Sequence, residues 1–194
     1  MIAFDTQQGF GKALHQLLLK IQQEFSQYSP AALPIKMHIA GGAALYLLTG
    51  ERVTEDVDAT FSKRVLLGTN IEVSYRDYDG QAAIVYLDRN YNDTLGLMHE
   101  NAAHDSIPVS IDGIDEKILR VQVLTPLDLA VSKLSRFSDE DRDDITLLAK
   151  KHLIDARSLR SRAESALAGY VGNLKGITNT IDIACRIVDS INPQ

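Results

Sequence analysis

The fold of this chain is decided by residues 41–58, which read GGAALYLLTGERVTEDVD. We expect Gly41 and Gly42 to end a strand and to begin a helix, because a short apolar segment precedes them and a helical segment follows. Glycine lets the backbone approach a ligand closely, and the free amides of a helix start attract negative charge. A glycine pair also occurs in ordinary turns, so its interpretation as a phosphate-binding turn depends on the residues that follow.

At the end of this stretch Asp56 and Asp58 flank Val57 at the start of a predicted strand. Side chains two residues apart in a strand point to the same side, so both carboxylates converge on one site. Mg²⁺ prefers hard oxygen ligands and usually shares its coordination shell with substrate phosphates. The stretch therefore predicts a magnesium site next to a phosphate-binding turn. The alternative is that Asp56 caps a helix or turn and that Asp58 is a charge on an edge strand.

Around this stretch, the residues up to 124 predict a mixed unit of helices and strands. Apolar residues from Phe10 to Phe25 recur at steps of three and four, which is typical of a helix with one buried face. Short apolar or alternating segments bounded by turn residues predict strands, and Asp79-Gly80 predicts a hairpin turn. The predicted strands are 35–40, 57–61, 71–76, 82–87, 107–111 and 118–124, and a helix is predicted at 43–48.

From Thr125 to the C-terminus the pattern is helical. Thr125 followed by Pro126 and Asp128 is a helix-start signature, and Ser138 with Asp141 repeats it. The predicted helices are 127–137, a second one from Ser138 through Ala149, 159–170 and 177–188. No repeat or Gly/Ser-rich linker interrupts the chain. We predict an α+β fold in which a small mixed sheet with flanking helices (1–124) is followed by a helical region (125–194) packed on it.

The composition of the 194 residues indicates an ordinary globular protein, with 45% hydrophobic and 24% charged residues. Cys185 is the only cysteine, so oxygen must supply most of the ligands of any bound metal. The longest apolar stretch, 40–48, is too short to cross a bilayer, and the first residues lack the pattern of a secretory signal. We expect a cytoplasmic protein with no membrane partner.

The net charge of −6 argues against a protein that coats nucleic acid non-specifically, because phosphate neutralisation supplies most of that binding. One stretch is nevertheless basic, with Asp155 as its only acid. It contains Lys150, Lys151, Arg157, Arg160 and Arg162, which we call the basic cluster. Such a cluster is typical of a solvated helix face, and it is also the candidate patch for a polyanion.

These motifs together resemble the nucleotidyltransferases of the DNA polymerase β superfamily, whose signature is a glycine pair followed about a helix later by two aspartates. Residues 52–58, RVTEDVD, resemble the arginine, threonine and aspartate pair of the AbiEii-like branch, which includes toxins of toxin–antitoxin systems. Residues 127–134, followed by Arg136, Arg142 and Asp144, resemble the helical lysine and aspartate motif of that branch. The resemblance spans residues 35–153.

The resemblance implies a metal and nucleotide site. Asp56 and Asp58 would hold one or two Mg²⁺ or Mn²⁺ ions. The nucleotide would be held by Gly41, Gly42, Arg52, Thr54 and Lys133. A third metal carboxylate is common in the superfamily, and Asp88 and Asp112 are the two candidates.

The same resemblance implies catalytic roles in the helical half. Lys133 would place a fixed positive charge on the triphosphate, unless it is an ordinary exposed helix lysine. Asp144 would orient Lys133 or the acceptor, or pair with Arg52, and Asp141 and Asp143 are the alternatives to it.

The expected reaction is of the EC 2.7.7 type, the transfer of a nucleoside monophosphate from a triphosphate such as ATP to an acceptor hydroxyl. The resemblance favours the 3′ end of tRNA as acceptor, a toxin-like role and a cognate antitoxin as candidate partner. A protein or small-molecule hydroxyl is the alternative acceptor, and a non-catalytic nucleotide-binding module is the alternative class. The loop 90–104, which contains His99, is a second candidate for substrate recognition.

Overall fold

The computed structural model of the chain describes residues 2, 4–68, 70–92 and 96–193. The chain forms two compact units, and each is built from two separate segments. The first unit comprises Met1–Tyr91 and Ile107–Val123, and the second comprises Asn92–Ser106 and Leu124–Gln194. The predicted α+β class is confirmed, since a mixed sheet with helices is followed by a helical C-terminal half.

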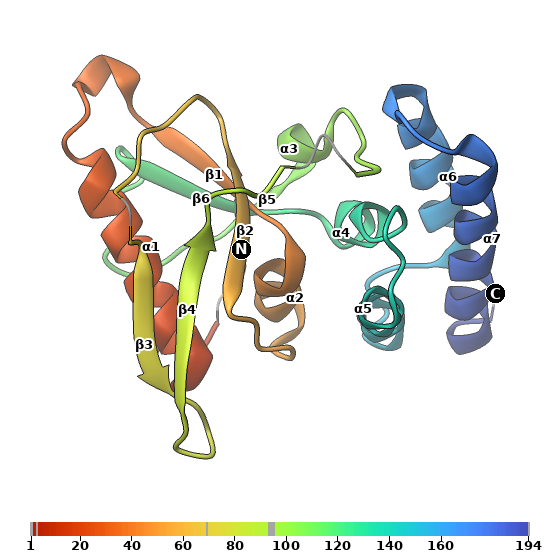
Figure 1. Cartoon of the computed structure of the whole chain (residues 1–194), viewed down its shortest axis with the longest axis horizontal. Coiled ribbons are helices and arrows are strands. Elements are labelled where there is room, and N and C mark those ends of the chain that lie inside the picture. The colour runs from red at the N-terminus through yellow and green to blue at the C-terminus, as the bar shows by residue number, and fades with distance from the viewer. Residues whose placement is uncertain (1, 3, 69, 93–95, 194) are drawn as a thin grey trace. The chain divides into compact units, whose positions relative to one another are not determined.

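A six-stranded mixed sheet forms the first unit, in the order β3-β4-β2-β1-β6-β5 (Figure 1). β1 runs parallel to β6 and antiparallel to β2, β2 runs parallel to β4, and β3 and β4 form the predicted hairpin. The short β5 pairs antiparallel with β6. The strands are β1 (Ile35–Ile39), β2 (Asp56–Phe61), β3 (Glu72–Arg76), β4 (Ala82–Asp88), β5 (Ile107–Pro108) and β6 (Leu119–Val123).

Helix α1 (Gly9–Phe25) covers one face of this sheet and lies along β3 and β4 (Figure 1). Its buried side is the apolar stripe that the three- and four-residue spacing predicts. The ring of Phe25 lies 5.7 Å from the ring of Phe61 on β2. Side chains alternate along a strand, so Asp56 and Asp58 project from the face of the sheet opposite to α1.

Helices make up the second unit. Helix α7 packs against α5 and α6, and α4 packs against both α5 and α6. The elements are α3 (Ala102–Asp105), α4 (Pro126–Ser132), α5 (Asp139–Lys150), α6 (Ala156–Ala166), the 3₁₀ turn η3 (Leu167–Gly169) and α7 (Leu174–Ile191). Within the described residues, no helix combines the length and the apolar character needed to span a membrane.

Polar side chains cap the starts of the four longer helices of this unit. The side chains of Thr125, Ser138, Asp155 and Asn173 each accept a hydrogen bond from a backbone amide in the first turn of α4, α5, α6 and α7. Such a cap stabilises a helix by about 1 kcal/mol because it satisfies a donor that the helix itself leaves free. The two helix-start signatures predicted from the sequence, at Thr125 and Ser138, are confirmed.

Several predicted boundaries differ from the structure. Helix α4 ends at Ser132 instead of residue 137, because the chain turns over the next residues and Phe137 adopts a φ of 48° before Ser138 starts α5. Strand β5 stops at Pro108, which has no N–H to donate, and Val109 forms a bridge with Ile2. Helix α6 spans 156–166 instead of 159–170, and the short α3 was not predicted.

Candidate functional site

The start of α2 (Gly41–Thr49) lies directly against the strand that carries the aspartate pair. The N–H of Ala40 donates a 2.8 Å hydrogen bond to the carbonyl of Asp58, which joins the helix start to β2. Gly41 has a φ of 58°, and a Cβ at this position would overlap the Asp58 carboxylate. A Cβ on Gly42 would lie 2.9 Å from the Cβ of Thr54. The space around both positions therefore requires glycine.

The N-terminus of α2 differs from those of the long helices of the second unit. Among the described residues, no side chain accepts a hydrogen bond from its first-turn amides as a cap. Amides at a helix start have no partner within the helix, and the helix dipole adds partial positive charge there. This helix start can therefore accept a phosphate oxygen next to Asp58.

Carboxylates from two neighbouring strands share the face of the sheet opposite to α1. In the parallel register of β2 with β4, Asp58 pairs with Asp88, and Asp56 pairs with Tyr86. All four side chains are on one face of the sheet. Residues paired in register point to the same side, and so do residues two apart in a strand, such as Asp56 and Asp58. Asp56, Asp58 and Asp88 are half-buried.

The register separates the two candidates for a third metal carboxylate. Asp88 lies on the strand next to Asp58, whereas Asp112 is exposed in a turn after β5. The carbonyl of Asp112 accepts a 2.7 Å hydrogen bond from Nε2 of His15 on α1, so this turn lies beside the helix that covers the other face. The geometry favours Asp88.

Two of these carboxylates accept hydrogen bonds, and a tyrosine with a raised pKa lies beside them. The hydroxyl of Thr54 donates to Oδ1 of Asp56 at 2.5 Å, and the N–H of Asn90 donates to Oδ1 of Asp88 at 2.8 Å. Partial burial and the negative charges of Asp56 and Asp88 raise the pKa of Tyr86. Negative charge is therefore concentrated on this face. Tyr86 was not among the predicted site residues, although its position two residues before Asp88 indicates that it shares that face.

These carboxylates fit the way in which Mg²⁺ binds. Among the described residues, no group of three or more His, Cys, Asp or Glu side chains is arranged to hold a metal ion. Mg²⁺ rarely uses such an all-protein cage, since it binds through one or two carboxylates together with water and substrate phosphates. Asp56 and Asp58 supply this donor set, and the charge that raises the pKa of Tyr86 is the charge that a divalent cation would neutralise.

The segment between α2 and β2 contains Arg52, whose φ of 77° is rare for a residue with a side chain. This left-handed turn lies two residues before Thr54, at the point where the chain turns into β2. The local backbone thus sets the position of Thr54, two residues before β2 begins at Asp56.

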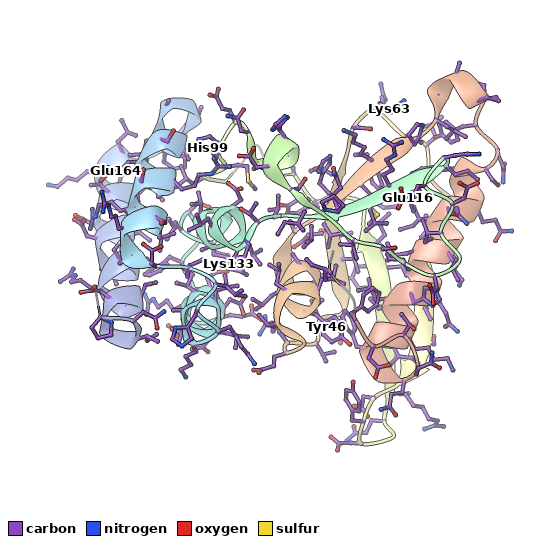
Figure 2. The ribbon with its side chains drawn as sticks, turned by 180° about the vertical axis from the view of Figure 1, so that it is seen from behind. Tyr46, Lys63, His99, Glu116, Lys133 and Glu164 are labelled. Carbon is purple, nitrogen blue, oxygen red and sulfur yellow. The ribbon has the colours of Figure 1, made fainter. Side chains whose placement is uncertain are left out.

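Lys133 and Asp144 come together in the second unit. Lys133, labelled in Figure 2, directly follows α4. Its Nζ lies 2.5 Å from Oδ2 of Asp144 on α5 and 3.8 Å from Oδ1 of Asp141. Only 8% of the Lys133 side chain is exposed, so its interpretation as an ordinary exposed lysine is wrong. Asp144 is also buried, whereas Asp143 is exposed.

Asp141 has a structural environment of its own. Arg136 donates two hydrogen bonds of 2.8 Å to its carboxylate, and the backbone and hydroxyl of Ser138 donate two more. Burial alone would raise the pKa of Asp141, but the hydrogen bonds from Arg136 and Ser138 outweigh it and lower the pKa to about 2. Asp141 thereby completes the capping box of α5.

The structure divides the basic cluster. Arg160 donates to Asp182 of α7 at 2.7 Å, and Arg162 donates to Asp128 at 2.8 Å and to Asp105 at 2.7 Å. These two arginines therefore join elements of the helical unit. The other three members, Lys150, Lys151 and Arg157, are exposed.

The comparisons with known proteins agree with the class of site described here. A glycine-started helix beside carboxylates on neighbouring strands is an arrangement suited to nucleotidyl transfer. The chain belongs to the family described as nucleotidyltransferase of unknown function (DUF6036), whose family model matches residues 16–175. The chain has no significant match among curated proteins or among solved structures. The family match supports a nucleotidyltransferase, and it does not extend to the AbiEii-like branch.

Proposed function

We propose that this nucleotidyltransferase moves a nucleoside monophosphate from a nucleoside triphosphate to a hydroxyl of RNA, with Asp56 and Asp58 as the ligands of Mg²⁺ or Mn²⁺. The observation that supports the proposal is the contact between the start of α2 and Asp58, because it brings a helix start suited to an anion close to a carboxylate suited to a metal ion. The 3′ end of tRNA is the acceptor that the sequence motifs favour.

In the proposed reaction the acceptor hydroxyl releases its proton to solvent and its oxygen attacks the α-phosphorus. The new P–O bond forms while the bond between the α-phosphorus and the oxygen bridging to the β-phosphorus breaks, and pyrophosphate leaves with that oxygen. The amides at Gly41 and Gly42 hold a phosphate oxygen, and Thr54 fixes the orientation of Asp56 through its hydrogen bond. The bound metal would polarise the α-phosphate and neutralise charge on the departing pyrophosphate. Asp88 would help to hold the metal beside Asp58.

Three finer assignments rest on the motifs quoted above. Lys133 is proposed to neutralise the triphosphate, and Asp144 to orient Lys133 through the 2.5 Å contact between their side chains. Arg52 is proposed to hold a phosphate of the nucleotide. The AbiEii-like branch, a toxin–antitoxin role and an antitoxin partner remain predictions from the sequence.

The test is the transfer of labelled nucleotide, with each of the four nucleoside triphosphates, to total RNA and to total protein in the presence of Mg²⁺. Asp56→Asn and Asp58→Asn should each abolish transfer, because each removes a metal ligand. Their stability should stay level or rise slightly, since one of two neighbouring carboxylates loses its charge. Asp79→Asn is the matched control, because it makes the same change at the exposed tip of the β3–β4 hairpin.

The same variants separate the rival classes. Wild-type chain should gain thermal stability with a triphosphate and Mg²⁺, because a ligand that binds the native state stabilises it. Normal turnover in Asp56→Asn would end the metal assignment. Triphosphate binding without transfer to any acceptor would favour a non-catalytic module, and labelling of protein alone would replace RNA as the acceptor.

A further inference from the structure

A polar pocket of about 470 Å³ lies within the helical unit, formed by α4, α6 and the segment before α3. Leu127 of α4 supplies an apolar part of its wall. Of the described residues that line it, none is acidic. The polar lining residues are His99, Arg157, Ser158, Ser161, Arg162 and Ser165. No ion pair within the described residues neutralises Arg157, so its charge favours an anion in this pocket although the chain has a net charge of −6.

Three donors form a row along this pocket. Arg157, Ser161 and Ser165 are four residues apart on α6, so they share one face of the helix, with roughly 5–6 Å between neighbouring Cβ atoms. Arg157 and Ser161 have no hydrogen-bond or ion-pair partner among the described residues. Their donors are therefore available to a ligand.

The hydrogen bonds of His99 leave the hydroxyl proton of Ser165 available as well. His99, labelled in Figure 2, is buried with 8% exposure. Its Nδ1 accepts a 3.1 Å hydrogen bond from the N–H of Asn101. A neutral ring then has its proton on Nε2, which lies 3.1 Å from Oγ of Ser165 and donates to it. Ser165 accepts there, so its own proton can point into the pocket.

Arg162 forms a fixed wall of the pocket. Its Nε and Nη2 donate to the fully buried Asp128, and Nη2 also donates to Asp105. The hydrogen bond to Asp128 raises the pKa of Arg162. Its Nη1 makes no hydrogen bond within the described residues, and the two carboxylates hold the guanidinium plane in place for a ligand that approaches Nη1.

We propose that this pocket binds the phosphate backbone of the RNA acceptor, with Arg157 as the principal phosphate ligand. The inference rests on the proposed function for the identity of the acceptor. A row of donors along a helix suits an extended polyanion better than a single small anion, because successive phosphates can each meet one donor. Within the basic cluster, Arg160 and Arg162 pair with carboxylates of the same unit, so Arg157 is the arginine that can bind RNA phosphate.

The test is the binding of a fluorescein-labelled single-stranded oligoribonucleotide to the full-length chain, without any nucleoside triphosphate, at several salt concentrations. Arg157→Gln should weaken binding about tenfold and reduce the slope of log affinity against log salt by roughly 0.7, the value for one phosphate contact on a single strand. Ser161→Ala should weaken binding several-fold with an unchanged slope. Arg157 is exposed and has no partner in the described chain, so neither fold nor stability should change.

Arg186→Gln is the matched control, because it removes the same charge from an exposed position on α7 outside the pocket. If Arg186→Gln and Arg157→Gln weaken RNA binding equally, the loss of affinity reflects only the overall charge of the chain, and the proposal is overturned. Full binding by Arg157→Gln, or no binding by the wild-type chain, would also overturn it. Displacement of the RNA by millimolar inorganic phosphate at constant ionic strength would assign the pocket to a small anion instead.

The nucleotide-transfer assay distinguishes this failure from failure of the proposed function. If Arg157→Gln transfers nucleotide to RNA at the wild-type rate, the pocket does not bind the acceptor, and the proposed enzyme activity is still supported. Pocket-dependent RNA binding by a chain that transfers no nucleotide would support the pocket and reject the activity. Asp56→Asn should bind the oligoribonucleotide as tightly as the wild type, since Asp56 does not line the pocket.

Discussion

Asp88 and Asp58 are neighbours because their strands pair in register, so Asp88 is the better candidate for a third metal carboxylate beside the proposed ligand Asp58. Asp88→Asn should lower the rate of nucleotide transfer or the affinity for Mg²⁺ by roughly 10- to 100-fold, the range observed when a supporting ligand is removed. The measurement is transfer as a function of Mg²⁺ concentration. Asp112→Asn, in the exposed turn beside α1, should behave as the wild type. The reverse result would make Asp112 the third carboxylate.

Gly41 is required for two reasons that can be tested separately. Its φ of 58° favours glycine, and an added Cβ would overlap the Asp58 carboxylate. Gly41→Ala should destabilise the protein by about 1–2 kcal/mol from the left-handed backbone alone, and should also displace the Asp58 carboxylate. Gly80→Ala is the control, since Gly80 has a φ of 78° and no atom near an added Cβ. In both variants, unfolding by denaturant should show a similar loss in the free energy of unfolding from the left-handed backbone.

Nucleotide transfer should then fall only in Gly41→Ala. Equal activity of the two variants would mean that the space between α2 and Asp58 has no catalytic importance.

At the scale of elements, the turn between α4 and α5 depends on a buried charge pair. Lys133→Met should destabilise the protein by about 3 kcal/mol, because Asp144 loses the ammonium group that lies 2.5 Å away. Lys133→Met combined with Asp144→Asn should recover more than half of this loss, since the second change removes the buried charge. A double-mutant cycle on the free energy of unfolding measures the coupling.

The same pair of variants separates a structural from a catalytic role of Lys133. If Lys133 acts on the triphosphate, the double variant should regain stability and remain inactive. Recovered transfer in the double variant would show that Lys133 only holds α4 and α5 together.

The start of α5 should respond to acid through Asp141, whose pKa of about 2 lies below the ordinary value of 3.8. A carboxylate with a lowered pKa stabilises the fold above its ordinary pKa, and this contribution disappears as the pH falls through the folded value. The loss should occur between about pH 4 and pH 2 and amount to about 2 kcal/mol. Asp141→Asn should be less stable at pH 7 and should lack this part of the acid dependence.

Denaturant midpoints measured between pH 7 and pH 2 test this prediction. The control is Asp139→Asn, which changes a side chain of the same helix that is 97% exposed and, among the described residues, pairs only with Arg142 at the surface. Its acid dependence should match that of the wild type, because exposed ion pairs contribute little. Identical curves for Asp141→Asn and the wild type would contradict the lowered pKa.

At the scale of the whole molecule, the features that the sequence predicted are local ones. The caps at Thr125 and Ser138 involve partners three residues away, and the hairpin turn at Gly80 joins consecutive strands, so each is visible within a few residues. The spacing of Asp56 and Asp58 likewise predicts that they share a face.

The features that the sequence could not predict depend on contacts between distant residues. The pairing of Asp58 with Asp88 follows from the strand order, in which β4 lies next to β2 and not only next to β3. Arg162 belongs to a basic stretch by composition, yet its partner Asp105 is 57 residues away. Its function as a link between elements becomes apparent only from the fold.

The discontinuous helical unit limits how the gene can be divided. The segment Asn92–Ser106 leaves the sheet after β4, contributes to the helical unit, and returns to the sheet at β5. A polypeptide that starts at residue 124 would therefore lack Asp105, which binds Arg162, and His99, which binds Ser165. Dividing the gene at residue 124 would separate the two segments of the helical unit, so neither product would contain the complete helical unit.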